Sequence, residues 1–579
     1  MKSPQHSVER IRQRFPSVTA DAIALAITAV GFSLRLSSIR GYWNNADEGI
    51  YYRIAHAPLA IASSMIADNA HPPLYYYLLR AVGSVFDDFV WLRVPALLFG
   101  TLSIFALYRL GTRIGGAACG IAAAVMLALS PGAIELSQVA RPYALQLLLL
   151  IGATGALLRY LQSRNPRLLV AYAIWMLAAA FTHYSSFLVL TGFVVALGFA
   201  AIARHFSARE LRDLAIAHVP VLIAGVALYS YHVEPVLLDS AMRREALGSW
   251  LGGYFVTGLE ALWPNFLDVF AYLAGPTLAG VGSIVFLISV GACLHGKRFA
   301  LVGVCVSVVS VAAAASALSI YPFGGTRHTA YLAPFLALTM GMATAVVFSM
   351  GTRAVVGSAL LLAMIVIARG PVAMAIGVTP QGPVEQPEFE ITRAEVDVFR
   401  DSFERLRATP GVLFMDLSTI YTLLPLMREA SIESEWTHRG ADSGQFAWGE
   451  RQVVVIPFWY MAVGSERINA PNHLWSSIRR AREHPALAKA LERDAHLVSA
   501  EGMALPRSIR ALSRSREERL AVVDDVSHTS HLSAFRLGVA AYQQQLASRV
   551  RERAAGQRPS GRDRADEAAS GIDRVSIAN

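Results

Sequence analysis

The sequence has little charge and little cysteine. Only 16% of its 579 residues are Asp, Glu, Lys or Arg, whereas 54% are hydrophobic, and this balance is too apolar for a single soluble core. The three cysteines, Cys119, Cys293 and Cys305, lie in apolar segments without a CxxC spacing, which argues against a disulfide framework and a zinc site. We therefore predict a polytopic membrane protein.

A basic stripe interleaved with aromatic residues is also missing, although the formal net charge is +9. Nucleic-acid binding needs such a stripe, so we do not expect a nucleic-acid partner. In a membrane protein a basic excess more often reflects arginines that anchor the cytoplasmic loops. The excess is therefore interpreted as a topology signal.

Long apolar runs are what the sequence has in abundance. Segments of about 20 residues are long enough to cross a bilayer. The first run ends in RLSSIRGYW rather than at a small-residue cleavage site, so it is interpreted as a retained span and not as a signal peptide. Eleven spans are predicted: 18–40, 90–110, 115–133, 143–160, 167–182, 185–203, 214–231, 267–293, 299–320, 328–350 and 354–370.

The segment HPPLYYYLLRAVGSVF, residues 71–86, is apolar but short, and it contains Arg80. If it does not span, most loop arginines and lysines fall on the cytoplasmic side, as the positive-inside rule requires. If it spans, this bias reverses for all later loops. It is therefore predicted to be an interfacial or re-entrant helix within a long first external loop, residues 41–89.

This topology predicts four regions. Residues 1–17 form a cytoplasmic N-terminus, and residues 18–370 form the membrane domain. Residues 371–550 form a small external α/β domain, in which GVLFMDLS and RQVVVIPFW resemble strands and residues 473–497 resemble a helix. Residues 551–579 are charged and lack large apolar side chains, so we expect a disordered tail.

Several polar residues fall near the external membrane surface in this topology, and their clustering is the main functional signal. Asp47 and Glu48 lie in the first external loop. The others are His71, Arg80, Arg141, Tyr143, His183, Tyr184, Arg327 and His328. Arg35 and Arg93 lie within predicted spans, where a charge is costly unless it is paired or faces a polar site. A site with carboxylates, arginines and histidines could accept a phosphate-bearing lipid headgroup.

Each of these features also has a structural interpretation. Asn45 and Glu48 have the spacing of a capping box at a helix start, and both Asp47 and Glu48 suit the positive end of a helix dipole. Tyr75, Tyr76 and Tyr77 suit an aromatic belt. His183 could be a satisfied histidine between two spans. Arg327 and His328 begin a span, where snorkelling is the ordinary explanation.

Motifs in order along the chain resemble a known family. They are LRLSSIRGYWNNADEGIYY, NAHPPLYYYLLRAVGSVF with WLRVPALLFG, ELSQVARPYALQ, FTHYSSFLVL and GTRHTAYLAPFLAL. Together they resemble the membrane glycosyltransferases of the GT-C fold. The chain is most similar to bacterial proteins of the glycosyltransferase family 39 type, which resemble protein O-mannosyltransferases and lipid A aminoarabinose transferases. The resemblance covers nearly all of residues 20–370.

The resemblance implies an inverting transfer of a sugar from a polyprenyl-phosphate donor, on the external face of a bacterial inner membrane. Asp47 matches the catalytic acid of such enzymes, with Glu48 beside it. His71 stands where aminoarabinose transferases carry a phosphate-contacting lysine, and Arg327 is the stronger candidate to stabilise the leaving phosphate. The further candidates for donor or substrate binding are Arg141, Tyr143, His183 and Arg35.

The sequence departs from some relatives after the third span, where they place an acid and this chain has Arg141-Pro142-Tyr143. Glu135 lies nearby. We expect no required cofactor and no metal site, although a divalent cation remains compatible with carboxylates and a phosphate donor. The expected partners are the donor, membrane lipids and an envelope acceptor of unknown class: lipid, polysaccharide or protein.

Two other functions remain open at this stage. A transporter or flippase for lipid-linked sugars would also need a cationic site among its spans, but it should show internal repeats or paired broken helices. An assembly protein would act through its C-terminal domain, and Asp47 would then be dispensable. The first of these is the main alternative to the glycosyltransferase.

Overall fold

The structure, a computed structural model, describes residues 17–67, 69, 71–238, 254–295, 299–352, 411–414, 424–425, 428 and 445–448. The chain divides into two units. One unit is made of Met1–Arg40, Ala62–Asp239 and Leu251–Glu388, and the other is made of Gly41–Ile61, Ser240–Trp250 and Phe389–Asn579. We call them the helical unit and the second unit.

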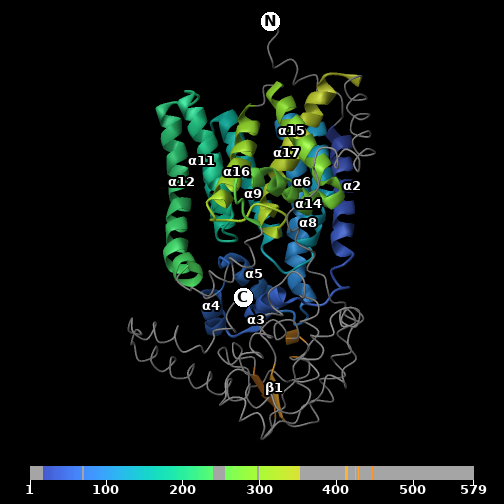
Figure 1. Cartoon of the computed structure of the whole chain (residues 1–579), viewed down its shortest axis with the longest axis vertical. Coiled ribbons are helices and arrows are strands. Elements are labelled where there is room, and N and C mark those ends of the chain that lie inside the picture. The colour runs from blue at the N-terminus through green and yellow to red at the C-terminus, as the bar shows by residue number, and fades with distance from the viewer. Residues whose placement is uncertain are drawn as a thin grey trace. The chain divides into compact units, whose positions relative to one another are not determined.

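The described part of the helical unit is almost entirely helical (Figure 1). Its elements are α2 (Ser17–Leu36), α5 (Leu74–Gly83), α6 (Val90–Gly115), α7 (Ala117–Leu129), α8 (Pro131–Glu135), α9 (Tyr143–Ser163), α10 (Arg167–Ala180), α11 (Ser186–Ile202), α12 (Ala208–Leu228), the π-helix η1 (Tyr229–Leu238), α14 (Leu259–Ala274), the 3₁₀ turn η3 (Pro276–Leu278), α15 (Ala279–His295), α16 (Phe299–Ala317), the 3₁₀ turn η4 (Arg327–Leu332) and α17 (Ala333–Ser349). Helix α4 (Leu59–Ala67) crosses the boundary between the units.

The centre of the helical unit is formed by α6, α7, α9 and α17, which pack on one another, while α11 packs on α16 and α10 on α12. Small residues bring α6 and α7 together: a Cβ on Gly111 would lie 2.8 Å from the Cα of Gly120. A Cβ on Gly341 of α17 would lie 2.6 Å from the carbonyl oxygen of Cys119. Backbones approach this closely where small residues face each other, as in membrane helix pairs.

Six described helices are long and apolar enough to cross a membrane: Val18–Leu36, Val90–Gly115, Tyr143–Ser163, Ala208–Glu234, Pro276–His295 and Arg327–Ser349. Shorter apolar helices cover Ala117–Leu129, Arg167–Ala180, Ser186–Ile202 and Leu301–Ala317. The chain is therefore a multi-pass membrane protein, as its composition predicts. The full count of eleven spans and its sidedness stay predictions.

One predicted span has the wrong boundaries. The segment 267–293 is not one continuous helix, because α14 ends at Ala274 and α15 begins at Ala279. Between them Gly275 has a φ of +90°, a conformation that glycine adopts at little cost, and Pro276 opens the 3₁₀ turn. Another predicted span, 354–370, lies outside the described residues.

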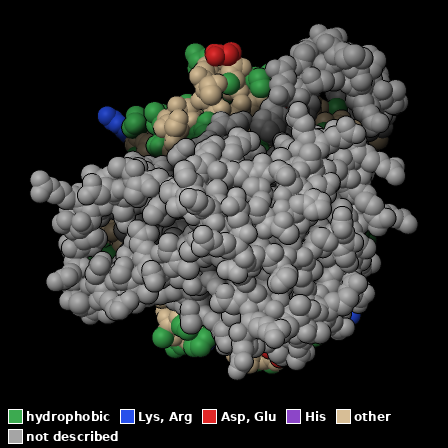
Figure 2. Space-filling model, turned by 60° about the horizontal axis from the view of Figure 1, so that its bottom comes forward, with side chains coloured by type: hydrophobic (Ala, Val, Ile, Leu, Met, Phe, Trp, Pro, Cys, Tyr) green, Lys and Arg blue, Asp and Glu red, His purple; other side chains and the backbone are tan. Residues whose placement is uncertain are grey.

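Large apolar side chains are exposed on the outer helices, as a membrane protein requires. On α12 they include Ile216, Ile223 and Val226, all more than half exposed. In the view of Figure 2, described atoms reach the surface only at the margins, where hydrophobic side chains lie among other side chains, backbone and a few charged groups. Exposed apolar surface of this kind faces lipid rather than water.

The predicted first external loop contains three short helices. Helix α3 (Ala46–His56) belongs to the second unit, and α5 belongs to the helical unit. With 10 residues, α5 is too short to span a bilayer, as predicted. Its interfacial placement stays a prediction.

The second unit also contains a pair of antiparallel strands, β1 (Gly411–Phe414) and β2 (Gln445–Trp448), with Gly411 opposite Trp448. The strand predicted in GVLFMDLS is confirmed by β1. The predicted strand RQVVVIPFW and helix 473–497 lie outside the described residues, as do the boundaries at 370 and 550. The external α/β domain therefore stays a prediction.

Candidate functional site

The helical unit gathers polar residues from four segments that are far apart in sequence. Helices α9 and α10 are consecutive and pack together, so the end of α10 returns to the level at which α9 begins. This brings His183, after α10, beside Tyr143 at the start of α9. The backbone N–H of Leu74 donates to the carbonyl of Phe181 at 2.9 Å, which holds the start of α5, and His71 before it, against the same loop.

The rings of these residues surround Tyr143. Its ring centroid lies 5.0 Å from that of His183 and 6.4 Å from those of His71 and His328. The His71 and His183 rings are 5.1 Å apart. The guanidinium carbon of Arg141 lies 5.7 Å from the Tyr143 ring centroid. We call these five residues, together with Arg327, the ring cluster.

Arg327 and His328 enter the cluster through η4, the 3₁₀ turn that begins α17. The side chain of Thr326 accepts a hydrogen bond from the backbone N–H of His328, and its hydroxyl lies 3.0 Å from His328 Nδ1. The ring of Tyr321 lies 6.0 Å from that of His328. Within the local sequence GTRH, Thr326 therefore caps the start of the helical turn and also orients the ring of His328.

The charge of the cluster resides on its arginines. Burial lowers the pKa of His71 well below its usual range, and His183, Arg141, His328 and Arg327 lower it further. Burial, followed by Arg141 and Arg327, lowers the pKa of His183 to about 3. Both histidines are therefore neutral near pH 7, beside two groups that stay charged.

The Tyr143 hydroxyl and His183 Nε2 are buried polar atoms of the cluster that have no hydrogen-bond partner among the described residues. Tyr143 is 1% exposed and His183 is 2% exposed. Buried polar groups are almost always hydrogen-bonded, so an unmet one needs an explanation. A hydroxyl beside two guanidinium groups favours an anionic ligand with acceptor oxygens.

Arg35 is fully buried, but its contacts are structural. Its Nε donates to Ser137 Oγ at 3.1 Å, and its terminal nitrogens donate to the carbonyls of Gly31, Ala128 and Leu127 at 3.0–3.1 Å. Two of those carbonyls end α7, where a cation is favoured by the helix dipole. The predicted role of Arg35 in donor binding stays a prediction, and its contacts give it a structural role.

Asp47 and Glu48 lie on α3 in the second unit. The predicted capping box is confirmed: the Asn45 side chain accepts from the Glu48 N–H at 2.8 Å, and the Asn45 N–H donates to the Glu48 carboxylate at 3.5 Å. Glu48 is 2% exposed, whereas Asp47 is half-buried. Of the two acids, Glu48 therefore has the structural role at the helix start.

Three residues that support the ring cluster were missed by sequence reasoning: Gln146, Ser185 and Ser186. Gln146 Nε2 donates to Ser185 Oγ at 2.7 Å and to Ser186 Oγ at 2.9 Å. Gln146 could have been found, since a polar side chain in an apolar span is costly without a partner. The buried acid Asp268 on α14, 2% exposed, carries the same signal and was also missed.

Part of the chain is similar in sequence to a known protein family. Residues 70–233 match the sequence model of the dolichyl-phosphate-mannose-protein mannosyltransferase family. The similarity to membrane glycosyltransferases that the motifs predict is thereby confirmed over this segment, which contains His71, Arg141, Tyr143 and His183. No curated protein matches the chain.

Solved structures of three transferases align with the chain at low identity. ArnT from Cupriavidus metallidurans is 15% identical, with 70% of this chain and 71% of that chain covered and a TM-score of 0.41. The Archaeoglobus fulgidus oligosaccharyltransferase is 15% identical, with 68% and 58% covered and a TM-score of 0.39. The S. cerevisiae Pmt1-Pmt2 protein O-mannosyltransferase is 16% identical, with 46% and 38% covered and a TM-score of 0.30. The chain thus spans 58% of the oligosaccharyltransferase and 38% of the mannosyltransferase.

Proposed function

We propose that the protein is a membrane glycosyltransferase that moves a sugar from a polyprenyl-phosphate donor to an envelope acceptor on the external face of the membrane. The observation that carries this proposal is the ring cluster. It combines two guanidinium groups with a buried Tyr143 hydroxyl that has no hydrogen-bond partner in the described ranges, and most of it lies in the segment that matches the mannosyltransferase family. A phosphate group supplies the negative charge and acceptor oxygens that such a site favours.

In the proposed reaction, an acceptor oxygen attacks the anomeric carbon and forms the new glycosidic bond. The bond between that carbon and the phosphate oxygen breaks, and its electron pair leaves with the polyprenyl phosphate. Arg141 and Arg327 offset the charge that develops on the departing phosphate. In-line displacement of this kind inverts the anomeric carbon.

Asp47 is proposed as the base that takes the proton of the attacking hydroxyl. This assignment rests on the motif resemblance. The Glu48 carboxylate takes part in the capping box, and Asp47, two residues after the N-cap, is half-buried. Asn45 and Glu48 would then fix the helix start that carries Asp47.

In the experiment, membranes that contain the full chain are incubated with a panel of polyprenyl-phosphate-linked monosaccharides. The release of free polyprenyl phosphate is measured. The panel contains mannose, glucose, galactose and 4-amino-4-deoxyarabinose. We expect release from at least one donor, and a loss of about 10²-fold or more in the variant Asp47→Asn, which is the usual contribution of a general base.

The matched control is Asp213→Asn, which makes the same change at an acid on α12 that pairs with the adjacent Arg212. It should release polyprenyl phosphate as the wild type does. If Asp47→Asn releases polyprenyl phosphate as fast as the wild type, Asp47 is not the base. A wild type that releases polyprenyl phosphate from none of the donors would contradict the proposed function itself.

A further inference from the structure

The hydrogen bonds around His183 determine which of its ring nitrogens carries the proton. Ser186 Oγ donates to the carbonyl of Ala179 at 2.9 Å, so its single hydrogen is used there. Ser186 Oγ must therefore accept from Gln146, 2.9 Å away, and this orients the Gln146 amide with its nitrogen toward both serines. Gln146 Nε2 then also donates to Ser185 Oγ.

Ser185 connects the Gln146 amide to the ring of His183. Its Oγ accepts from Gln146 and lies 2.9 Å from His183 Nδ1, and it also has the Tyr321 hydroxyl as a neighbour. The backbone N–H of Ser185 decides the direction, because it donates to Nδ1 at 3.3 Å. A ring nitrogen that accepts from an N–H carries no proton, so the ring is the neutral tautomer with its proton on Nε2, and an imidazolium would place an N–H against this donor.

His183 Nε2 is therefore a hydrogen-bond donor that has no partner among the described residues and lies in a buried side chain. It belongs to the ring cluster, where the tilted rings of Tyr143 and His71 lie near it at centroid distances of 5.0 and 5.1 Å. A neutral donor in a fixed direction adds a short-range contact to the long-range charge of the two arginines.

We propose that His183 is a phosphate-binding residue: Gln146 and Ser185 lock its ring in the Nε2–H tautomer, and this N–H donates to a phosphate oxygen of the polyprenyl-phosphate donor. This proposal rests on the proposed function for the identity of the ligand. Gln146 and Ser185 are positioning residues, since they act only through the ring of His183.

The buried His218 of α12 provides an internal control, because its contacts predict the opposite tautomer. Its Nδ1 lies 2.7 Å from the carbonyl oxygen of Leu214, which can only accept, so Nδ1 carries the proton. Its Nε2 lies 3.0 Å from the hydroxyl of Tyr172 and accepts from it. The same protein thus holds two buried neutral histidines that should differ in one spectroscopic property.

The first experiment is nitrogen NMR of the full chain, labelled with ¹⁵N-histidine and reconstituted in lipid nanodiscs at pH 7. The variants His183→Gln and His218→Gln assign the two signals by difference. We expect a protonated Nε2 for His183 and a protonated Nδ1 for His218, and adding undecaprenyl phosphate should shift the His183 Nε2 signal and leave the His218 signals unchanged. A protonated Nδ1 on His183, or no shift on ligand addition, would overturn the proposal.

The second experiment measures the affinity of nanodisc-bound protein for undecaprenyl phosphate, with undecaprenol as the neutral reference. His183→Gln keeps an N–H donor near the position of Nε2, whereas His183→Leu has none. We expect the leucine variant to bind at least tenfold more weakly than the wild type, and the glutamine variant to stay within about threefold. Both variants are checked for insertion and thermal unfolding, so that a folding defect is seen separately.

Equal affinities of the two variants would overturn the role of His183 while leaving the proposed function intact. If the wild type itself does not prefer undecaprenyl phosphate to undecaprenol, the proposed function fails and the phosphate partner of His183 fails with it. The tautomers seen by NMR do not depend on that outcome, so the two failures can be told apart.

Discussion

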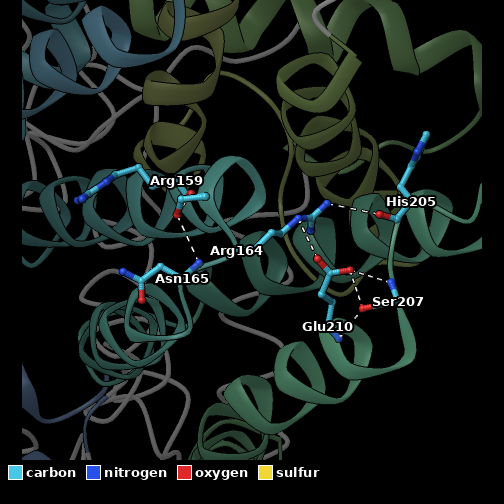
Figure 3. A network of polar contacts seen from close by, with 7 residues as sticks. Arg159, Arg164, Asn165, His205, Ser207 and Glu210 are labelled. Carbon is cyan, nitrogen blue, oxygen red and sulfur yellow. Dashed lines mark hydrogen bonds and ion pairs between the residues drawn. The ribbon is translucent and has the colours of Figure 1, made fainter.

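The two ends of helix α9 use arginine in opposite ways. At its C-terminal end, Arg164 forms an ion pair with Glu210 at 3.0 Å and donates to the carbonyl of His205 at 3.4 Å (Figure 3). Its guanidinium carbon also lies 5.0 Å from the ring centroid of Phe206. Glu210 also accepts from the N–H and hydroxyl of Ser207, completing a capping box for α12. These partners lie at the surface and satisfy one another.

At the N-terminal end of α9, the ring cluster is buried, and its Tyr143 hydroxyl and His183 Nε2 have no hydrogen-bond partner among the described residues. The Arg164 end joins two loops at little desolvation cost. The ring cluster instead buries two polar atoms that no described residue satisfies, which lowers stability. On our proposal, this difference separates a structural contact from a site that binds a ligand.

The largest expected effect on stability concerns His183 and pH. Its folded pKa of about 3 is below the unfolded value of about 6.5, so as the pH falls below 6.5 the unfolded chain takes up a proton that the folded chain does not. This stability is present above pH 6.5 and is lost as the pH falls toward 3, by about 1.4 kcal/mol per pH unit. Between pH 6.5 and pH 5 the loss is about 2 kcal/mol for this residue.

The measurement is the free energy of unfolding in detergent across this pH range, for the wild type and His183→Gln. In the variant, the free energy of unfolding should decrease less steeply as the pH falls, because the contribution of His183 is gone. His205→Gln, which changes an exposed histidine at the Arg164 end, should unfold with the pH dependence of the wild type. An unchanged slope in His183→Gln would contradict a buried neutral ring at this position.

A smaller effect on stability is expected when either of two buried tyrosines is replaced by phenylalanine. The Tyr172 hydroxyl hydrogen-bonds His218 Nε2 at 3.0 Å, so Tyr172→Phe should destabilise the fold by about 1 kcal/mol. The Tyr143 hydroxyl has no such partner in the described part of the chain, so Tyr143→Phe should unfold at the wild-type temperature or above. Its defect should appear instead as weaker binding of undecaprenyl phosphate. If Tyr143→Phe is less stable than Tyr172→Phe, the Tyr143 hydroxyl stabilises the fold and does not serve ligand binding.

The smallest effect is expected at the Arg164 end. The Arg164 side chain is 38% exposed, and exposed ion pairs contribute about 0.2–1 kcal/mol. Arg164→Ala and Glu210→Gln, measured singly and together, should give a coupling free energy within that range that decreases with salt. Sugar transfer should be unchanged. Loss of transfer in these variants would mean that both ends of α9 take part in function.

Much of this fold could be predicted because apolar runs of bilayer length and the capping residues are local signals. The capping box of Asn45 and Glu48 followed from spacing, and the start of a helical segment near Arg327 followed from an apolar run. The break at Gly275 and Pro276 was overlooked, because the hydropathy of the run outweighs its turn residues. The strand patterns from residue 411 onward are short, and short patterns do not predict how the strands of a domain are arranged.

The candidate site was predicted as a set of residues but not as a geometry. The topology placed His71, Tyr143 and His183 at one surface, and the structure brings their rings together. No sequence pattern indicated that Gln146 would fix the ring of His183 through Ser185, because this depends on hydrogen bonds between α9 and the loop after α10. The same limit applies to Arg35, where only the contacts show that the guanidinium holds the end of α7.

The most direct test of the central claim is the affinity of the full chain in nanodiscs for undecaprenyl phosphate relative to undecaprenol. We expect the wild type and Arg164→Gln to prefer the phosphate by at least about tenfold, and the inserted double variant Arg141→Gln/Arg327→Gln to lose this preference. A double variant that still prefers the phosphate would contradict the claim that the ring cluster is the phosphate site.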